Sequence, residues 1–137
     1  MTMHHQRDVS WRARYRTFLH AARGVWTLLA TQWNARIHAA SALIVAGAGF
    51  WLELNRIEWC LIVFAIGFVW VTEGLNTAIE FVVDKASPEM HPLAKQAKDV
   101  AAGAVLSAAL VAVLIGLLVL GPKLLMALNS AGGLESR

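Results

Sequence analysis

Apolar positions along this chain fall into one periodic stripe followed by three long runs. In the stripe they recur at steps of three and four, and they are Trp11, Tyr15, Phe18, Ala22, Trp26, Leu29 and Trp33. A helix turns by about 100° per residue, so these side chains share one narrow face. The stripe predicts an amphipathic helix over about residues 11–35. The polar residues 1–10 before it are expected to form a flexible N-terminus.

The three long runs cover about residues 37–54, 57–83 and 100–120. About 20 apolar residues in a helix cross the hydrocarbon core of a bilayer, so each run predicts a membrane span. The very short first connection predicts a tight antiparallel hairpin. The connection over residues 84–98 contains Pro88 and Pro92, which disfavour a continuous helix. Gly121 and Pro122 predict the end of the last span, leaving residues 122–137 as a C-terminal tail.

Composition supports a membrane protein. The chain has 137 residues, of which 58% are hydrophobic and only 15% are charged, whereas soluble domains carry about 25% charged residues. The single cysteine, Cys60, excludes an internal disulfide and a multi-cysteine zinc site. The expected fold is therefore an all-α integral membrane domain over residues 11–121, with one amphipathic helix and three spans.

Arginines lie largely off the aromatic face of the first helix. Basic residues on one side and tryptophans on the other are typical of a helix in the membrane interface. A soluble core helix is the less favoured alternative, because long apolar runs follow. Nucleic-acid binding is not expected, since no further basic patch follows.

Basic residues also predict orientation, because they are enriched in cytoplasmic loops. Nine of the twelve lie in the N-terminal segment or the second connection: Arg7, Arg12, Arg14, Arg16, Arg23, Arg36, Lys85, Lys95 and Lys98. The other three are Arg56, Lys123 and Arg137. The N-terminus is therefore expected in the cytoplasm.

Polar residues within the second run provide the candidate chemistry. They are Glu73, Asn76, Thr77, Glu80 and Asp84, whose spacings place them on one helical face. Lys98 and Asp99 open the third run, and Asn34, Arg36 and His38 open the first. The predicted topology brings all three groups to the cytoplasmic boundary.

This set contains the parts of a phosphoryl-transfer site. Carboxylates can bind Mg²⁺, a lysine can neutralise phosphate, and a further carboxylate can accept a proton from a hydroxyl. No P-loop or protein-kinase signature is present in the sequence. Polar contacts between helices, or a proton or ion pathway, are alternatives that spacing alone does not separate from a kinase.

Three segments resemble the prokaryotic diacylglycerol kinase family, which includes undecaprenol kinases. They are residues 34–38 (NARIH), 73–84 (EGLNTAIEFVVD) and 97–106 (AKDVAAGAVL). The resemblance implies a three-span enzyme with an interfacial helix in the bacterial inner membrane, working as a homotrimer with shared active sites. It implies transfer of the γ-phosphate of ATP, with Mg²⁺, to the hydroxyl of diacylglycerol or undecaprenol. A non-enzymatic assembly or proton-relay subunit is the alternative.

The resemblance also implies residue roles. Glu73 would be the general base on the lipid hydroxyl, and Glu80 would bind the metal. The nucleotide would contact Asn76, Glu80, Asp84, Glu89, Met90, His91, Lys98 and Asp99. The lipid would contact Asn34, Arg36 and Glu73. The family often has a metal-binding glutamate at the position of Gln32, which supplies an amide oxygen without negative charge and is the weaker candidate ligand.

Overall fold

The computed structural model describes residues 11–89 and 91–132. Within them the chain forms four α-helices: α1 (Trp11–Thr31), α2 (Trp33–Trp51), α3 (Arg56–Ala86) and α4 (Pro92–Gly132). The expected flexible N-terminus, residues 1–10, lies outside the described residues, as do Met90 and residues 133–137. The all-helical prediction is confirmed.

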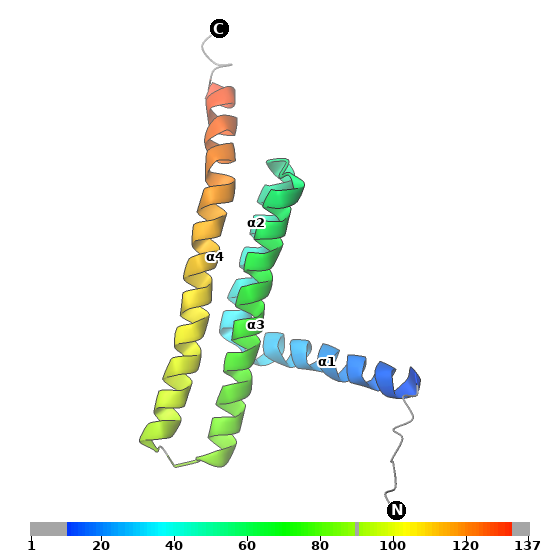
Figure 1. The fold of residues 1–137 in the computed structure, drawn as a ribbon, viewed down its shortest axis with the longest axis vertical. Helices are drawn as coiled ribbons and strands as arrows, with labels where there is room; N and C mark the ends of the chain where they lie inside the picture. The colour runs from blue at the N-terminus through cyan, green and yellow to red at the C-terminus, as the bar shows by residue number, and fades with distance from the viewer. Residues whose placement is uncertain (1–10, 90, 133–137) are drawn as a thin grey trace, which may run out of the picture.

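Helices α3 and α4 form an antiparallel pair, α2 packs mainly on α3, and α1 projects sideways from this bundle (Figure 1). Among the described helices, α3 and α4 are long and apolar enough to cross a membrane. With a rise of 1.5 Å per residue, their 31 and 41 residues give lengths of about 46 and about 61 Å, well above the roughly 30 Å of a hydrocarbon core.

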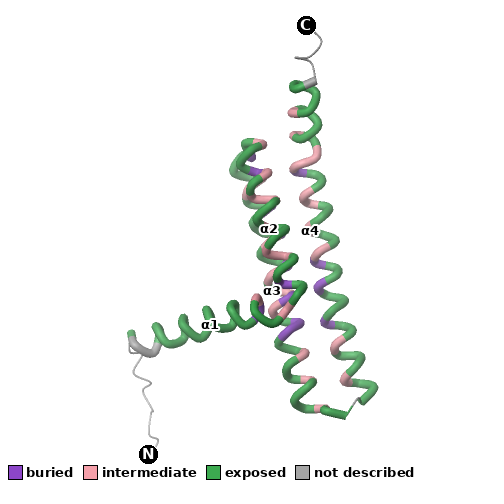
Figure 2. The backbone as a smooth tube through the Cα atoms, turned by 180° about the vertical axis from the view of Figure 1, so that it is seen from behind, coloured by how far each residue is buried: buried purple, intermediate pink, exposed green. Residues whose placement is uncertain are grey.

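Most large apolar side chains point away from the bundle. Leu43, Val100 and Leu118 are examples, with 68–76% of their surface exposed. Buried positions gather where the helices pack together and at the turn between α2 and α3 (Figure 2), and they include a small cluster of Leu54, Ile62 and Val119. An apolar exterior of this extent suits lipid contact better than water.

A tight turn joins α2 to α3 and confirms the predicted hairpin. Asn55 caps α3: its side chain accepts hydrogen bonds from the amides of Ile57 and Glu58, and Glu58 accepts one from the Asn55 amide. This reciprocal capping box satisfies amides that the first helical turn would leave unpaired. Near the turn, a Cβ on Gly49 would lie 2.9 Å from the Trp59 ring, so only glycine permits this approach.

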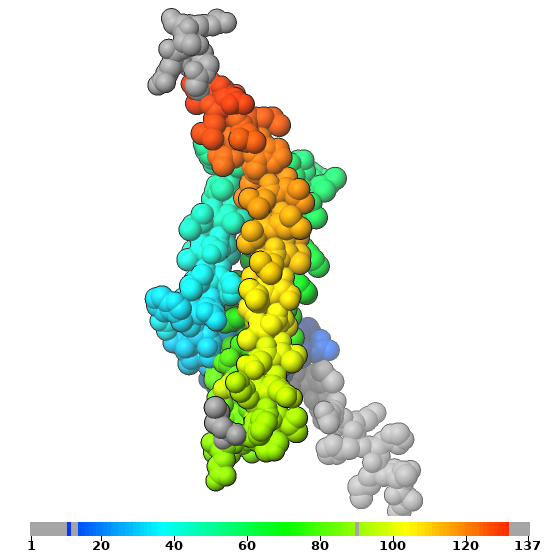
Figure 3. All heavy atoms as spheres, turned by 90° about the vertical axis from the view of Figure 1, so that its left-hand side faces the viewer, coloured from blue at the N-terminus to red at the C-terminus, as the bar shows by residue number. Residues whose placement is uncertain are grey.

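The predicted helix end at Gly121–Pro122 is wrong, because α4 continues through Pro122 to Gly132. The expected C-terminal tail is therefore helical over 122–132. Helix-forming leucine, methionine and alanine residues follow the proline. Lys123 also ties α4 to the hairpin, since its Nζ lies 3.2 Å from Glu58 Oε2 and 3.2 Å from the Glu53 carbonyl oxygen. In the space-filling view α4 runs unbroken past α2 (Figure 3).

Two other predicted boundaries need correction. The single helix over 11–35 is broken at Gln32, whose backbone is extended. The connection expected over 84–98 narrows to residues 87–91. Pro92 takes the first position of α4, where its missing amide costs no helical hydrogen bond, and the His91 ring accepts a hydrogen bond from the Leu93 amide.

Candidate active site

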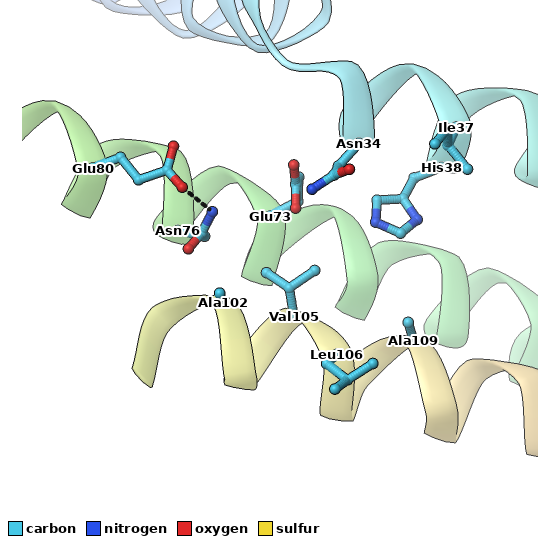
Figure 4. A pocket seen from close by; sticks show the side chains of 10 residues that line it. All are labelled: Asn34, Ile37, His38, Glu73, Asn76, Glu80, Ala102, Val105, Leu106 and Ala109. Carbon is cyan, nitrogen blue, oxygen red and sulfur yellow. Dashed lines mark hydrogen bonds between the residues drawn. The ribbon is translucent and has the colours of Figure 1, made fainter. Parts of the chain in front are cut away.

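A cavity of about 300 Å³ lies where α2, α3 and α4 meet (Figure 4). Its lining consists of Asn34, Ile37, His38, Glu73, Asn76, Glu80, Ala102, Val105, Leu106 and Ala109. The polar side chains come from α2 and α3, whereas the α4 wall is apolar. The cavity therefore presents polar groups on one side and an apolar surface on the other.

Glu73 is the most deeply placed polar residue of this cavity. Its surface is 2% exposed, and Asn34 and His38 extend toward it from α2 (Figure 4). Within the described residues its Oε2 has no hydrogen-bond partner. A buried carboxylate oxygen without a partner is costly in a packed protein, and this one is free to accept a hydrogen bond from a hydroxyl in the cavity.

Asn76, Thr77 and Glu80 continue the same face of α3, as the spacing predicted. The Asn76 side-chain amide donates to Glu80 Oε1 at 3.0 Å, and Thr77 donates to the Glu73 carbonyl at 3.0 Å. Asn76 and Thr77 are 6% and 5% exposed. Asn76 Oδ1 is a second buried oxygen without a partner in the described part of the chain.

These oxygens fit Mg²⁺, which prefers oxygen ligands. No group of three or more His, Cys, Asp or Glu side chains in the described residues is arranged to hold a metal. Mg²⁺ at phosphoryl-transfer sites is commonly held by one or two carboxylates together with substrate phosphates and waters. The Glu80 carboxylate and Asn76 Oδ1 match that smaller ligand set. Gln32 does not line the cavity.

Asp84 and Lys98 lie outside the cavity and contact each other. Lys98 Nζ is 2.9 Å from Asp84 Oδ1, joining the end of α3 to the start of α4. The hydrogen bond from Lys98 to Asp84 raises the pKa of Lys98, which lies before the predicted span of α4. Asp99, Glu89 and His91 are exposed at the same end of the molecule, and Met90 lies outside the described residues.

Arg36 points away from the cavity toward α1. Its Nε donates to the Leu29 carbonyl at 2.8 Å and its Nη2 donates to the Ala30 carbonyl. Both acceptors belong to the last turn of α1. The expected lipid contact of Arg36 is thus untested, while its hydrogen bonds link two helices.

His38 is a cavity residue that the sequence-based assignment of site roles left out. It stands four residues after Asn34, one helical turn further along the same face of α2. That spacing was available in the sequence. What the sequence lacked was the rotation of α2 that turns this face toward Glu73.

A larger apolar groove of about 540 Å³ runs along α2, α3 and α4 next to the cavity. Ile37, His38 and Ala109 line both spaces. The remaining groove walls are mostly alanine, valine, isoleucine, leucine and glycine. An apolar chain in the groove would therefore lead directly to the polar cavity.

Comparison with known proteins identifies the family. The model of the family described as prokaryotic diacylglycerol kinase matches residues 19–120. The chain belongs to this family. The matched range contains every residue of the cavity, and the family assigns the chain to the lipid kinases.

Relatives in this family carry two activity names. An undecaprenol kinase of Bacillus subtilis is 48% identical over 110 residues, which are 80% of this chain and 89% of that protein. A diacylglycerol kinase of Synechocystis sp. is 44% identical over 110 residues, which are 80% of this chain and 63% of that protein. A diacylglycerol kinase of Escherichia coli K12 is 37% identical over 79 residues, or 58% of this chain and 65% of that protein.

Proposed function

We propose that this lipid kinase transfers the γ-phosphate of ATP to the primary hydroxyl of a membrane lipid in the α2–α3–α4 cavity. The observation that carries this proposal is the buried Glu73 carboxylate beside the junction of a polar cavity and an apolar groove. Its Oε2 has no hydrogen-bond partner in the part of the chain that the structure describes. A lipid hydroxyl must leave the apolar phase to react, and this junction provides both environments.

Glu73 acts as the general base. Its Oε2 accepts the proton of the lipid hydroxyl as the hydroxyl oxygen forms a bond to the γ-phosphorus. The bond between the γ-phosphorus and the bridging oxygen breaks, and ADP leaves. Asn34 and His38 extend toward Glu73 from α2, where they orient the lipid head group and exclude competing water. Such positioning supplies much of the rate of phosphoryl transfer.

Glu80 and Asn76 are the residues proposed to hold Mg²⁺. Bound Mg²⁺ would neutralise charge on the transferred phosphate. The hydrogen bond from Asn76 to Glu80 fixes both side chains one turn apart on α3. The end of α3 and the start of α4 would receive the nucleotide, through Asp84, Lys98 and Asp99 and the loop residues Glu89, Met90 and His91.

Undecaprenol is the proposed principal acceptor. Of the three relatives given above, the one matched over the largest share of its own length, 89%, is named undecaprenol kinase. The groove beside the cavity is long and apolar, which suits an isoprenoid chain. Diacylglycerol is the competing acceptor, because other relatives carry that name.

The proposed membrane arrangement has three spans, α2, α3 and α4, with α1 in the interface. Asn34, Arg36 and His38 lower the hydropathy of α2 at its start, but its 19 residues are about as long as the hydrocarbon core is thick. The basic-residue distribution supports the proposal that the N-terminus and the cavity lie at the cytoplasmic face of the inner membrane. The homotrimer with shared sites is proposed from the family resemblance.

The test is a side-by-side phosphorylation assay with purified protein in mixed micelles. Radiolabelled ATP, Mg²⁺ and either undecaprenol or diacylglycerol are supplied, and labelled lipid is extracted. We expect lipid-dependent transfer, with the higher kcat/KM for undecaprenol. Glu53→Gln is a matched control, because this exposed carboxylate lies in the turn between α2 and α3 and does not line the cavity. Absence of lipid-dependent transfer to either acceptor would overturn the kinase proposal in favour of a non-enzymatic subunit.

A further inference from the structure

The C-terminus of α1 is completed by a side chain of the next helix. The hydrogen-bond ladder of α1 reaches the Gln32 amide, which donates to the Leu28 carbonyl at 2.9 Å. The next two carbonyls, of Leu29 and Ala30, accept from the Arg36 guanidinium instead. One arginine therefore satisfies two carbonyl groups that the break at Gln32 removes from the helix ladder.

Charge adds to this arrangement. The C-terminal end of a helix carries a partial negative charge, and a cation there is stabilising. The last turn of α1 contains no basic residue of its own, so the charge comes from Arg36, seven residues after Leu29. The planar guanidinium can serve two acceptors at once, which a lysine ammonium on a flexible stem does less well.

Arg36 also stands within the stretch of α2 that forms the active-site wall. Asn34 and His38, two residues before and after it, line the cavity. Ala35, beside it, is 1% exposed and holds this turn of α2 against the bundle. The guanidinium thus connects α1 directly to the turns of α2 that carry two cavity side chains.

We infer that Arg36 is a positioning residue for the lipid kinase reaction. By capping α1 it fixes the direction in which α1 leaves α2, and so the depth of Asn34, His38 and Glu73 relative to the membrane surface on which α1 lies. The two donor atoms turned toward α1 are engaged by backbone carbonyls. The expected effect of Arg36 on kcat rests on the proposed function, whereas its expected effect on the direction of α1 does not.

The geometric test measures distances between α1 and α3. Spin labels are attached to the native Cys60, which is exposed on α3, and to a cysteine introduced by Ala21→Cys on the exposed surface of α1. Labelled protein is diluted with unlabelled Cys60→Ser protein in lipid nanodiscs to suppress distances between subunits. We expect a narrow distribution that broadens in Arg36→Ala and is intermediate in Arg36→Lys.

Matched controls make this measurement decisive. Arg23→Ala removes an arginine from α1 itself and should leave the distribution narrow. If Arg36→Ala does not insert correctly, Arg36→Gln keeps one side-chain donor and should still broaden the distribution. An unchanged distribution in the correctly inserted Arg36 variants would overturn the inference.

Kinetics separate positioning from lipid binding. Because the cavity wall would be misplaced in Arg36→Ala, kcat should fall about tenfold. The KM for the lipid should stay within about twofold of the original value. Arg36→Lys should recover part of kcat. A large rise in KM with kcat preserved and distances unchanged would instead assign Arg36 to the lipid head group. If the parent protein showed no lipid phosphorylation, the proposed function would fail, while the distance measurement would still decide the role of Arg36 in fixing α1.

Discussion

The side-chain amide of Asn76 donates a 3.0 Å hydrogen bond to Glu80, one turn further along α3, while its own Oδ1 has no hydrogen-bond partner among the described residues. The bond occupies one Glu80 oxygen, and Asn76 Oδ1 points away from Glu80 (Figure 4). An amide oxygen beside a carboxylate suits a divalent cation with bound phosphate. Asn76 and Glu80 are therefore the pair that we propose to hold Mg²⁺.

Replacing Glu80 tests that function. In Glu80→Gln the shape is kept and the negative charge is lost, so the Mg²⁺ concentration for half-maximal activity should rise by about tenfold or more. A Mg²⁺ titration of lipid phosphorylation measures this, with Glu53→Gln as the control. An unchanged titration curve would count against Glu80 as a metal-binding residue.

Replacing Glu73 tests the proposed base. Glu73→Gln keeps the size of the side chain but cannot accept the hydroxyl proton, so kcat should fall by about 10²–10⁴-fold. Binding of a fluorescent ATP analogue should be nearly unchanged, because Glu73 is not among the residues proposed to contact the nucleotide. Near-normal turnover in this variant would refute the base assignment.

A double-mutant cycle tests the contact between Lys98 and Asp84. If Asp84 acts by holding Lys98, then Lys98→Ala, Asp84→Asn and the double variant should raise KM for ATP by similar factors, of about tenfold. Additive effects would mean that each residue meets the nucleotide independently.

The hydrogen bond from Lys98 to Asp84 raises the pKa of Lys98. The pair's contribution to stability is therefore full below the ordinary lysine pKa and lost as pH rises through the raised value.

Close packing near the turn between α2 and α3 gives a stability prediction with a built-in control. A Cβ on Gly49 would meet the Trp59 ring at 2.9 Å, whereas a Cβ on Gly47 meets nothing within 4 Å. Gly49→Ala should therefore destabilise the fold by about 1–3 kcal/mol, and Gly47→Ala should leave it unchanged or slightly more stable. Unfolding in increasing dodecyl sulfate, followed by circular dichroism, compares the two. Equal stability of both variants would show that the bundle relaxes around the added methyl group.

The amino-acid pattern predicts the candidate site better than the helix ends. Glu73, Asn76 and Thr77 are buried on one face of α3. That shared face could be predicted because it follows from the helical period of 3.6 residues alone. The sequence pattern did not predict the break at Gln32, because the residue types there do not disfavour a helix. The stop at Pro122 was expected from local propensity, which the anchoring of Lys123 to the hairpin overrides. The pairing of Lys98 with Asp84 depends on how two helices meet, which no local pattern encodes.

On the proposed function, the apolar groove beside the cavity would determine how the acceptor reaches the enzyme. Ile37 and His38 line both spaces, so a lipid moving along the groove would reach the cavity that contains Glu73 without passing through water. Arrival would then occur by lateral diffusion in two dimensions. The rate of the kinase would follow the mole fraction of acceptor in the bilayer, and added inert lipid would slow it even when the bulk amounts of enzyme and substrate stay constant.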